Sequence, residues 1–310
     1  MRPSQSLALS CLLAAHASAH GVVTMIKGAN GVDMPVADGT PRDCSSNRCG
    51  SQADTAIIRD REIQSGDVGP LGRTQGNGPI DAATMVQNFM GAATAPTNNG
   101  ANSSVGVEDT IGNGAGAAND KREESASSSS LFSPRQLLKG LAGLLGGGGG
   151  AGAGTKSTVA TETNVAATAG AGASSGGLPT CADDGTIKMV FHQINQDGAG
   201  PLEAAVDPTS GGTQASVFQT AEVTQDVPGV GFQGLSLATN TDFPLKVQMP
   251  AGMTCDGTIA GVQNVCVVRV RNGAAAGPFG GSAAFTQSPA ARKRAIEYRL
   301  RKRMAKALKA

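Results

Sequence analysis

Apolar and polar residues alternate along several short stretches in the second half of the chain. In FPLKVQMP, residues 243–250, every second residue is apolar, and the residues between are Pro, Lys, Gln and Pro. This period of two is typical of a strand with one buried face. TIKMVFHQI, SVFQTAEV and NVCVVRVR behave similarly, and Pro, Gly, Asn and Asp separate the stretches. The pattern predicts a mainly β protein with an immunoglobulin-like β-sandwich.

The composition changes along the chain and predicts five segments. One stretch consists largely of Gly, Ala, Ser, Thr and Asn, which bury too little apolar surface to offset the entropy of ordering. We therefore expect a long disordered Gly/Ala/Ser-rich insertion that interrupts the sandwich, with one short helix predicted inside it at 133–145. The predicted segments are a signal peptide at 1–19, an N-terminal part of the sandwich at 20–90, the insertion at 91–177, a C-terminal part at 178–290 and a basic tail at 291–310.

The first residues have the features of a secretory signal. Arg2 supplies positive charge, residues 7–15 form a short apolar run, and Ala17-Ser18-Ala19 is a small-residue cleavage site. A cut before His20 is predicted, and a cut after Ala17 is also permitted. No later stretch is apolar enough for a membrane helix. We therefore expect a secreted protein, extracellular or associated with the cell wall.

Composition and charge limit the expected size of the core and the classes of partner. The 310 residues include 44 Gly, one Tyr, eight Phe and no Trp, so the packed core is expected to be small. The formal net charge is +1, but the last twenty residues contain nine Lys or Arg and one Glu. The rest of the chain is acidic on balance and has no basic cluster of the kind that binds nucleic acid.

The basic tail, ARKRAIEYRLRKRMAKALKA, permits three interpretations. It is a helix that adheres to anionic polymers or lipid head groups, a segment removed at the dibasic pairs Lys293-Arg294 and Lys302-Arg303, or a plain solvated tail. The sequence leaves all three open.

Five cysteines remain after signal removal, which fits an oxidising compartment. The spacings predict two short loops closed by disulfides, Cys44 with Cys49 and Cys255 with Cys266, and leave Cys181 over. A zinc site is the competing interpretation. No pair has the two-residue spacing of a zinc ribbon or knuckle, and secretion favours disulfides.

Signal removal would also leave two histidines, His20 and His192. The terminal amine and ring of His20, together with the imidazole of His192, would supply the three nitrogens of a copper histidine brace. Copper(II) favours nitrogen ligands in a tetragonal arrangement. His192 lies on the strand face opposite Ile187, Met189 and Phe191, so it is predicted to point away from the core. The alternative is a structural or exposed strand histidine.

Other catalytic arrangements have less support. His192 with Asp183 or Asp184 and a serine would form a hydrolase triad, but no nucleophile motif marks a serine. Asp197 and Glu203 form a carboxylate pair in turn-rich sequence, where they can equally cap turns. The catalytic residues are therefore left unassigned.

Four stretches of the chain resemble one family. The stretches are HGVVTMIKGANGVDMPVADGTPRD (20–43), QINQDGAGPL (193–202), FPLKVQMPAGMTCDGTIAGVQNVCVVRVRN (243–272) and GPFGGS (277–282). They resemble the fungal Egh-type, or Mas-type, appressorium-associated secreted virulence factors and cell-surface proteins. The resemblance implies a secreted fungal protein linked to host penetration or infection structures. For such a protein we expect a non-enzymatic binding or wall-related role. Its expected partner is a cell-wall polysaccharide or the host surface.

A second similarity is to lytic polysaccharide monooxygenases, secreted copper enzymes with an N-terminal histidine on a β-sandwich. It implies His20 and His192 as copper ligands, Gln193 or Gln196 as a donor behind them, and Phe279 as an axial neighbour. The chain departs from this family because it has no Trp and its one Tyr lies in the basic tail. A flat aromatic surface for crystalline polysaccharide is therefore missing. A copper-dependent oxidase or monooxygenase remains the alternative function.

Overall fold

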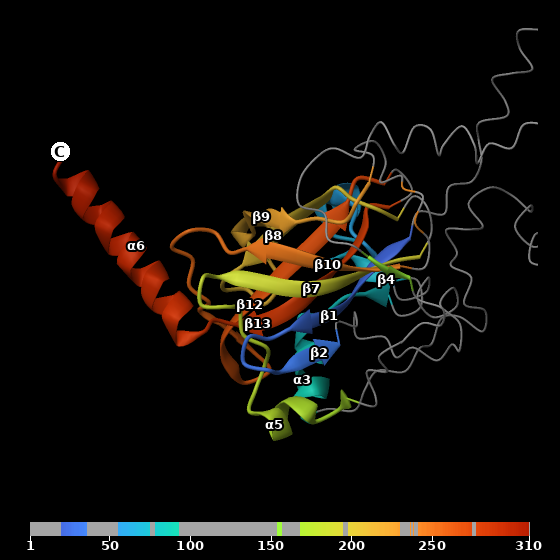
Figure 1. Cartoon of the computed structure of the whole chain (residues 1–310), viewed down its shortest axis with the longest axis horizontal. Helices are drawn as coiled ribbons and strands as arrows, with labels where there is room; N and C mark the ends of the chain where they lie inside the picture. The colour runs from blue at the N-terminus through green and yellow to red at the C-terminus, as the bar shows by residue number, and fades with distance from the viewer. Residues whose placement is uncertain are drawn as a thin grey trace, which may run out of the picture.

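The computed structural model describes residues 20–35, 55–74, 78–92, 154–156, 168–194, 198–229, 236, 238, 241–274 and 277–309. Within these ranges the protein is mainly β, with thirteen strands in antiparallel pairs (Figure 1). The strands are β1 Gly21–Lys27, β2 Asp33–Pro35, β3 Ala56–Ile57, β4 Arg73–Thr74, β5 Gly78–Pro79, β6 Thr155–Lys156, β7 Thr186–Gln193, β8 Leu202–Asp207, β9 Gln219–Gln225, β10 Thr241–Gln248, β11 Gly257–Ile259, β12 Val262–Asn272 and β13 Phe279–Thr286.

The strands follow one continuous hydrogen-bonded path that curls on itself. Their order is β2-β1-β7-β10-β9-β8-β12-β13-β3-β4-β5, with β11 beside β12 and β6 beside β10. β9 joins the two sets of strands because it pairs with both β10 and β8. The predicted mainly β class is confirmed. The immunoglobulin-like topology is not confirmed, since that fold consists of two separate sheets.

The four stretches with alternating residues all contribute strands. They correspond to β7, β9, β10 and β12. In β10 the residues Phe243, Leu245 and Val247 are buried and their neighbours are half-buried or exposed. Because these alternate side chains are buried in the core, the period of two is clear in the sequence.

The N-terminal block adds strands at two places in the path, as predicted. β1 pairs with β7 and β3 pairs with β13. β1 also packs closely over β13, where a Cβ atom added to Gly281 would lie 3.0 Å from Cβ of Val23. The absence of a side chain at Gly281 therefore brings the start of β1 beside the start of β13.

Helices are few in the described ranges. They are α2 Asp60–Ser65, α3 Ala82–Phe89, α5 Ala171–Ser175, the 3-10 turn η4 Ala215–Val217 and α6 Pro289–Ala307. α3 begins at Asp81, whose side chain accepts a hydrogen bond from Ala83 N, and it buries Met85, Val86 and Phe89. Most of the predicted insertion, including the helix predicted at 133–145, lies outside the described residues.

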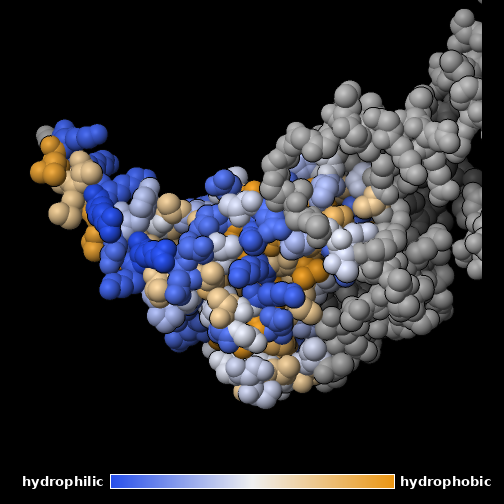
Figure 2. All heavy atoms as spheres, in the orientation of Figure 1, coloured by the Kyte–Doolittle hydropathy of each residue, from blue (hydrophilic) through white to orange (hydrophobic). Residues whose placement is uncertain are grey.

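The basic tail forms the long helix α6. Figures 1 and 2 show it projecting from the body of the protein toward the C-terminus. Ser288 caps its start by accepting a hydrogen bond from Ala291 N, and Pro289 occupies the first turn. In the described part of the chain, no helix combines the length and apolar character needed to cross a bilayer.

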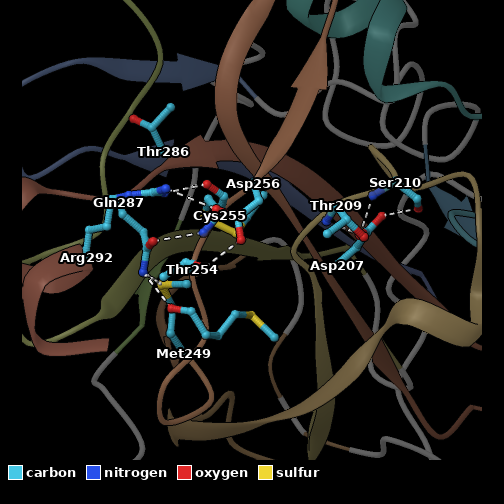
Figure 3. The surroundings of a disulfide bond; sticks show 12 residues. Asp207, Thr209, Ser210, Met249, Thr254, Cys255, Asp256, Thr286, Gln287 and Arg292 are labelled. Carbon is cyan, nitrogen blue, oxygen red and sulfur yellow. Dashed lines mark hydrogen bonds and ion pairs between the residues drawn. A yellow bond between two sulfur atoms is a disulfide. The ribbon is translucent and has the colours of Figure 1, made fainter. Parts of the chain in front are cut away.

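The predicted disulfide between Cys255 and Cys266 is present and closes the β11–β12 hairpin. Figure 3 shows its surroundings, where Cys255 N donates to Gln287 Oε1 at 2.9 Å. Cys181 is a buried free thiol, and burial raises its pKa. Cys44 and Cys49 lie outside the described residues.

Candidate functional site

The β1–β7 ladder brings the two predicted copper ligands together. Val22 lies opposite His192 in this pair, and Ile194 N donates to His20 O at 2.9 Å. His20 and His192 are therefore diagonal neighbours across the pair, a relation that places Cα atoms about 7–8 Å apart. The pairing of β1 with β7 therefore places two histidines that are far apart in sequence close together in space.

His192 has the hydrogen bonding of a metal-ligating histidine. Its Nδ1 lies 2.5 Å from Oδ1 of Asp242, the residue directly opposite it on β10. Its Nε2 is buried and has no hydrogen-bond partner among the described residues. A carboxylate on one ring nitrogen fixes the tautomer and leaves the other nitrogen as a lone-pair donor. The contact with Asp242 therefore fixes the orientation of the His192 ring and leaves Nε2 on the other side of it.

His192 lies on the face of β7 opposite to Phe191, but its side chain is buried and does not extend into solvent. His192 alternates with the core residues Met189 and Phe191, yet it is only 4% exposed. A buried imidazole with one unsatisfied nitrogen costs free energy unless something binds it. His192 is therefore not a solvent-exposed strand residue.

His20 lies just before β1 and is also buried. Its ring contacts the ring of Phe279, with centroids 4.8 Å apart and planes inclined by 32°. A side chain at Gly21 would collide with the Phe191 ring and the Gly198 carbonyl oxygen. Glycine at position 21 therefore allows the chain after His20 to pack closely against Phe191 and Gly198.

Gln193 points to the opposite face of β7 from His192, since successive strand residues alternate. It is fully buried, and its amide donates to Ala238 O at 2.7 Å and to Ser236 Oγ at 3.3 Å. These bonds attach the end of β7 to the segment before β10. Gln196, the other proposed donor, lies outside the described residues.

The donor set fits copper in type. Imidazole nitrogens suit copper, and a buried Nε2 held in place by a carboxylate is a ready ligand. Among the residues that the structure describes, no group of three or more His, Cys, Asp or Glu side chains could hold a metal ion. A three-nitrogen site here therefore requires the amine that cleavage before His20 would free.

The described residues do not bring Asp184 and His192 together as a hydrolase triad would require. Asp184 accepts a hydrogen bond from Thr186 N at the start of β7, and hydrogen bonding with Thr186 lowers the pKa of Asp184. His192 lies six residues further along the strand, about 20 Å away at the rise of a β-strand. Glu203 instead pairs with Arg271 at 3.3 Å. Asp197 lies outside the described residues.

Two pockets lie away from the histidines. One, of about 490 Å³, lies between the base of α6 and the turn that contains Asp184, and is lined by Met249, Arg294 and Tyr298 among others. The second, of about 520 Å³, is lined by strands β8 and β9 with Arg269 and Arg271. Neither lining includes His20 or His192.

Sequence reasoning missed Asp242. The residue directly precedes the alternating stretch that starts at Phe243, so its place in a strand could be inferred. Its partnership with His192 depends on the register between β7 and β10, which one sequence does not specify.

Comparison with known proteins shows what the chain is similar to. The family model for Egh16-like virulence factors matches residues 18–280. The appressoria-specific virulence factor GAS2 of Pyricularia oryzae strain 70-15 is 50% identical over 306 residues, which cover 98% of this chain and 95% of that protein. GAS1 of the same strain is 41% identical over 123 residues, 38% of this chain and 47% of that protein.

No solved structure matches the chain significantly. The family match includes His20, the strand β1 that follows it, and the strand β7 that carries His192. The chain belongs to the Egh16-like virulence factor family.

Proposed function

We propose that the protein is a secreted virulence factor of fungal infection structures, which acts outside the cell by binding a wall polymer or the host surface. The observation that carries the proposal is the 50% identity to the appressoria-specific virulence factor GAS2 over nearly the whole length of both chains. The disulfide between Cys255 and Cys266 supports it, because such bonds persist in oxidising compartments.

Complementation tests this proposal. A Pyricularia oryzae strain that lacks GAS2 is supplied with the full chain or with a chain that lacks residues 1–19. The full chain is expected to be found outside the hyphae and to restore infection of leaves to the level of a GAS2 control. The shortened chain is expected to stay inside the cell and to restore nothing. Full restoration by the intracellular form would contradict a role outside the cell.

A second candidate function is that of a copper protein with an oxidase-like or monooxygenase-like activity. The observation that favours it is the buried, unbonded Nε2 of His192, held by the Asp242 carboxylate beside His20. Bound copper would supply one-electron and oxygen chemistry. The residues themselves would bind and orient the ion: His20 through its ring and freed amine, His192 through Nε2, and Asp242 through the proton on Nδ1.

Copper binding is measured by calorimetry and electron paramagnetic resonance on a chain that starts at His20. One tightly bound ion with nitrogen hyperfine coupling is expected. His192→Ala is expected to abolish it, and Asp242→Asn to weaken it by about 10–100-fold. Gln193→Ala is the matched control, since that side chain faces the other side of β7. Equal affinity in the His192→Ala and wild-type chains would exclude the site, whatever the activity.

A further inference from the structure

The helix α6 is attached to the body along its first three turns, up to Arg299. Ala291 and Ala295 are buried, and Arg292 Nη1 donates to Cys255 O at 2.7 Å (Figure 3). Arg299 Nη2 donates to Thr254 Oγ1 at 2.6 Å. Every residue from 298 to 309 is exposed. The part of the helix after Arg299 therefore extends into solvent from a fixed base.

An apolar edge runs along this projecting part. Four apolar residues are spaced four positions apart: Ile296, Leu300, Met304 and Leu308. Because this spacing slightly exceeds one helical turn, they form a stripe that winds gradually around one side of the helix. Their exposed fractions rise from 44% through 52% and 65% to 88% away from the body. In the described part of the chain, all exposed large hydrophobic side chains lie in this C-terminal segment. Figure 2 shows hydrophobic and hydrophilic residues interleaved on the projecting helix.

The same segment concentrates positive charge. Nine Lys or Arg and one Glu lie within the last twenty residues, whereas the whole chain carries a net charge of only +1. Arg292 and Arg299 are bonded to the body, and Arg301 pairs with Glu297 at 3.3 Å. Most of the remaining cations lie on the exposed part of the helix and flank the apolar edge.

The apolar edge and the positive charge together indicate which kind of partner binds the exposed part of α6. A second copy of the chain would cover the apolar edge, but it would bring two strongly cationic helices together, which is unfavourable. A soluble polyanion would neutralise the charge, but it would leave the leucines and the methionine in water. An anionic bilayer does both, because apolar side chains enter the acyl boundary while Arg and Lys extend to the phosphates.

We propose that α6 is an interfacial helix that attaches the protein to the surface of an anionic lipid bilayer. The helix lies in the plane of the head groups with its apolar edge, defined by Ile296, Leu300, Met304 and Leu308, toward the acyl chains. Its low apolar content keeps it at the interface instead of across the membrane. The base of the helix, bonded to residues of the 252–256 turn, then holds the β-rich body beside the membrane.

Flotation with large vesicles tests this proposal on the full-length secreted chain, whose intact C-terminus is verified by mass. Binding is expected to vesicles that contain phosphatidylserine and not to pure phosphatidylcholine. The triple variant Leu300→Gln, Met304→Gln, Leu308→Gln keeps every charge, and Lys302→Gln, Arg303→Gln, Lys306→Gln keeps the apolar edge. Each is expected to weaken binding about tenfold or more.

A matched control removes three charges from the body instead, by Lys27→Gln, Lys188→Gln and Lys246→Gln, and is expected to bind as the wild type does. Far-ultraviolet circular dichroism checks that α6 still forms in each variant. The proposal is wrong if the apolar-edge variant binds vesicles as tightly as the wild type does and both bind soluble polygalacturonate equally. That result would indicate that α6 adheres to anionic polymers. Vesicle binding absent in the wild type would also overturn the proposal, and the extracellular role would be untouched by either result.

Discussion

Asp207 shows how a single buried carboxylate organises a loop. It is fully buried at the end of β8 and accepts hydrogen bonds from Thr209 N at 2.8 Å, Ser210 N at 2.8 Å and Gly212 N at 2.6 Å. The Ser210 hydroxyl donates to it as well. The sequence shows only an acidic residue before Pro208, so neither its burial nor its set of donors could be predicted.

Asp207→Ala should be strongly destabilising because it leaves several buried N–H donors unsatisfied. We expect the free energy of unfolding to fall by about 3 kcal/mol, measured by urea denaturation. Asp81→Ala, which removes the N-cap of α3, is the comparison and should cost about 1 kcal/mol. A loss at Asp207 no larger than the loss at Asp81 would contradict this account of the loop.

Asp226 should make stability depend on pH. Burial raises the pKa of this carboxyl above its ordinary value of 3.8, against the lowering effect of hydrogen bonds from Leu202 N and Val227 N. The folded state therefore favours the protonated acid. This stabilisation is fully present below the unfolded pKa and is lost as pH rises through the higher folded pKa.

Asp226→Asn keeps an acceptor oxygen but cannot ionise. Relative to the variant, the wild-type protein should be most stable below pH about 4 and should lose that advantage as pH rises toward neutral. Urea denaturation of both proteins across this range measures the difference. A difference that does not vary with pH would show that Asp226 has the same pKa folded and unfolded.

The histidine site was predicted only in part from sequence. The number of histidines and the alternation along β7 indicated the pair and the face that His192 occupies. Its burial and its bond to Asp242 were not predicted, because both depend on the register of β7 against β10. The expectation that Phe279 lies near His20 came from the similarity to lytic polysaccharide monooxygenases and not from any local pattern.

Alternation of apolar and polar residues identified the strands whose buried side chains are large. β10 and β12 were readily identified, whereas β8, LEAAVD, and β13, FGGSAAFT, were not. β13 is buried along almost its whole length and is rich in Gly and Ala, because β1 crosses it closely. A strand covered on both faces has no polar side and therefore no period of two.

The outer face of the sheet carries a row of like charges. Lys27 lies opposite Lys188 on β7, which lies opposite Lys246 on β10. Directly opposed like charges destabilise a sheet. Lys188→Glu should therefore raise the free energy of unfolding by about 0.5–1 kcal/mol at low ionic strength. High salt should reduce this gain, and a gain independent of salt would exclude a charge effect.

The β11–β12 hairpin depends on its disulfide. The bond links residues 11 positions apart, and a closed loop of that size restricts the unfolded chain. Cys255→Ser together with Cys266→Ser should lower the free energy of unfolding by about 2–4 kcal/mol. Adding a reductant to the wild-type protein should reproduce the loss, and no further loss should occur in the double variant. Equal stability of wild type and variant would show that the hairpin needs no covalent closure.

For the whole molecule, the sequence predicted a β-rich protein whose N-terminal and C-terminal blocks share one set of strands. β1 and β3 confirm this by joining β7 and β13 across a long separation in sequence. The strand order and the single curled path were not predictable, since long-range pairing is specified by packing between distant segments. The structure shows a helix in the basic tail, whereas the three interpretations of that segment, which are adhesion to anionic surfaces, dibasic processing and a plain solvated tail, stay predictions.

The proposed role outside the cell and the proposed copper site both depend on where the mature chain begins. Intact mass and N-terminal sequencing of the protein recovered from culture medium measure this. We predict a secreted chain whose first residue is His20, which supports the role outside the cell and frees the amine beside His192. A chain that keeps residues 1–19 and is recovered only from inside the cell would contradict that role and remove the copper site with it.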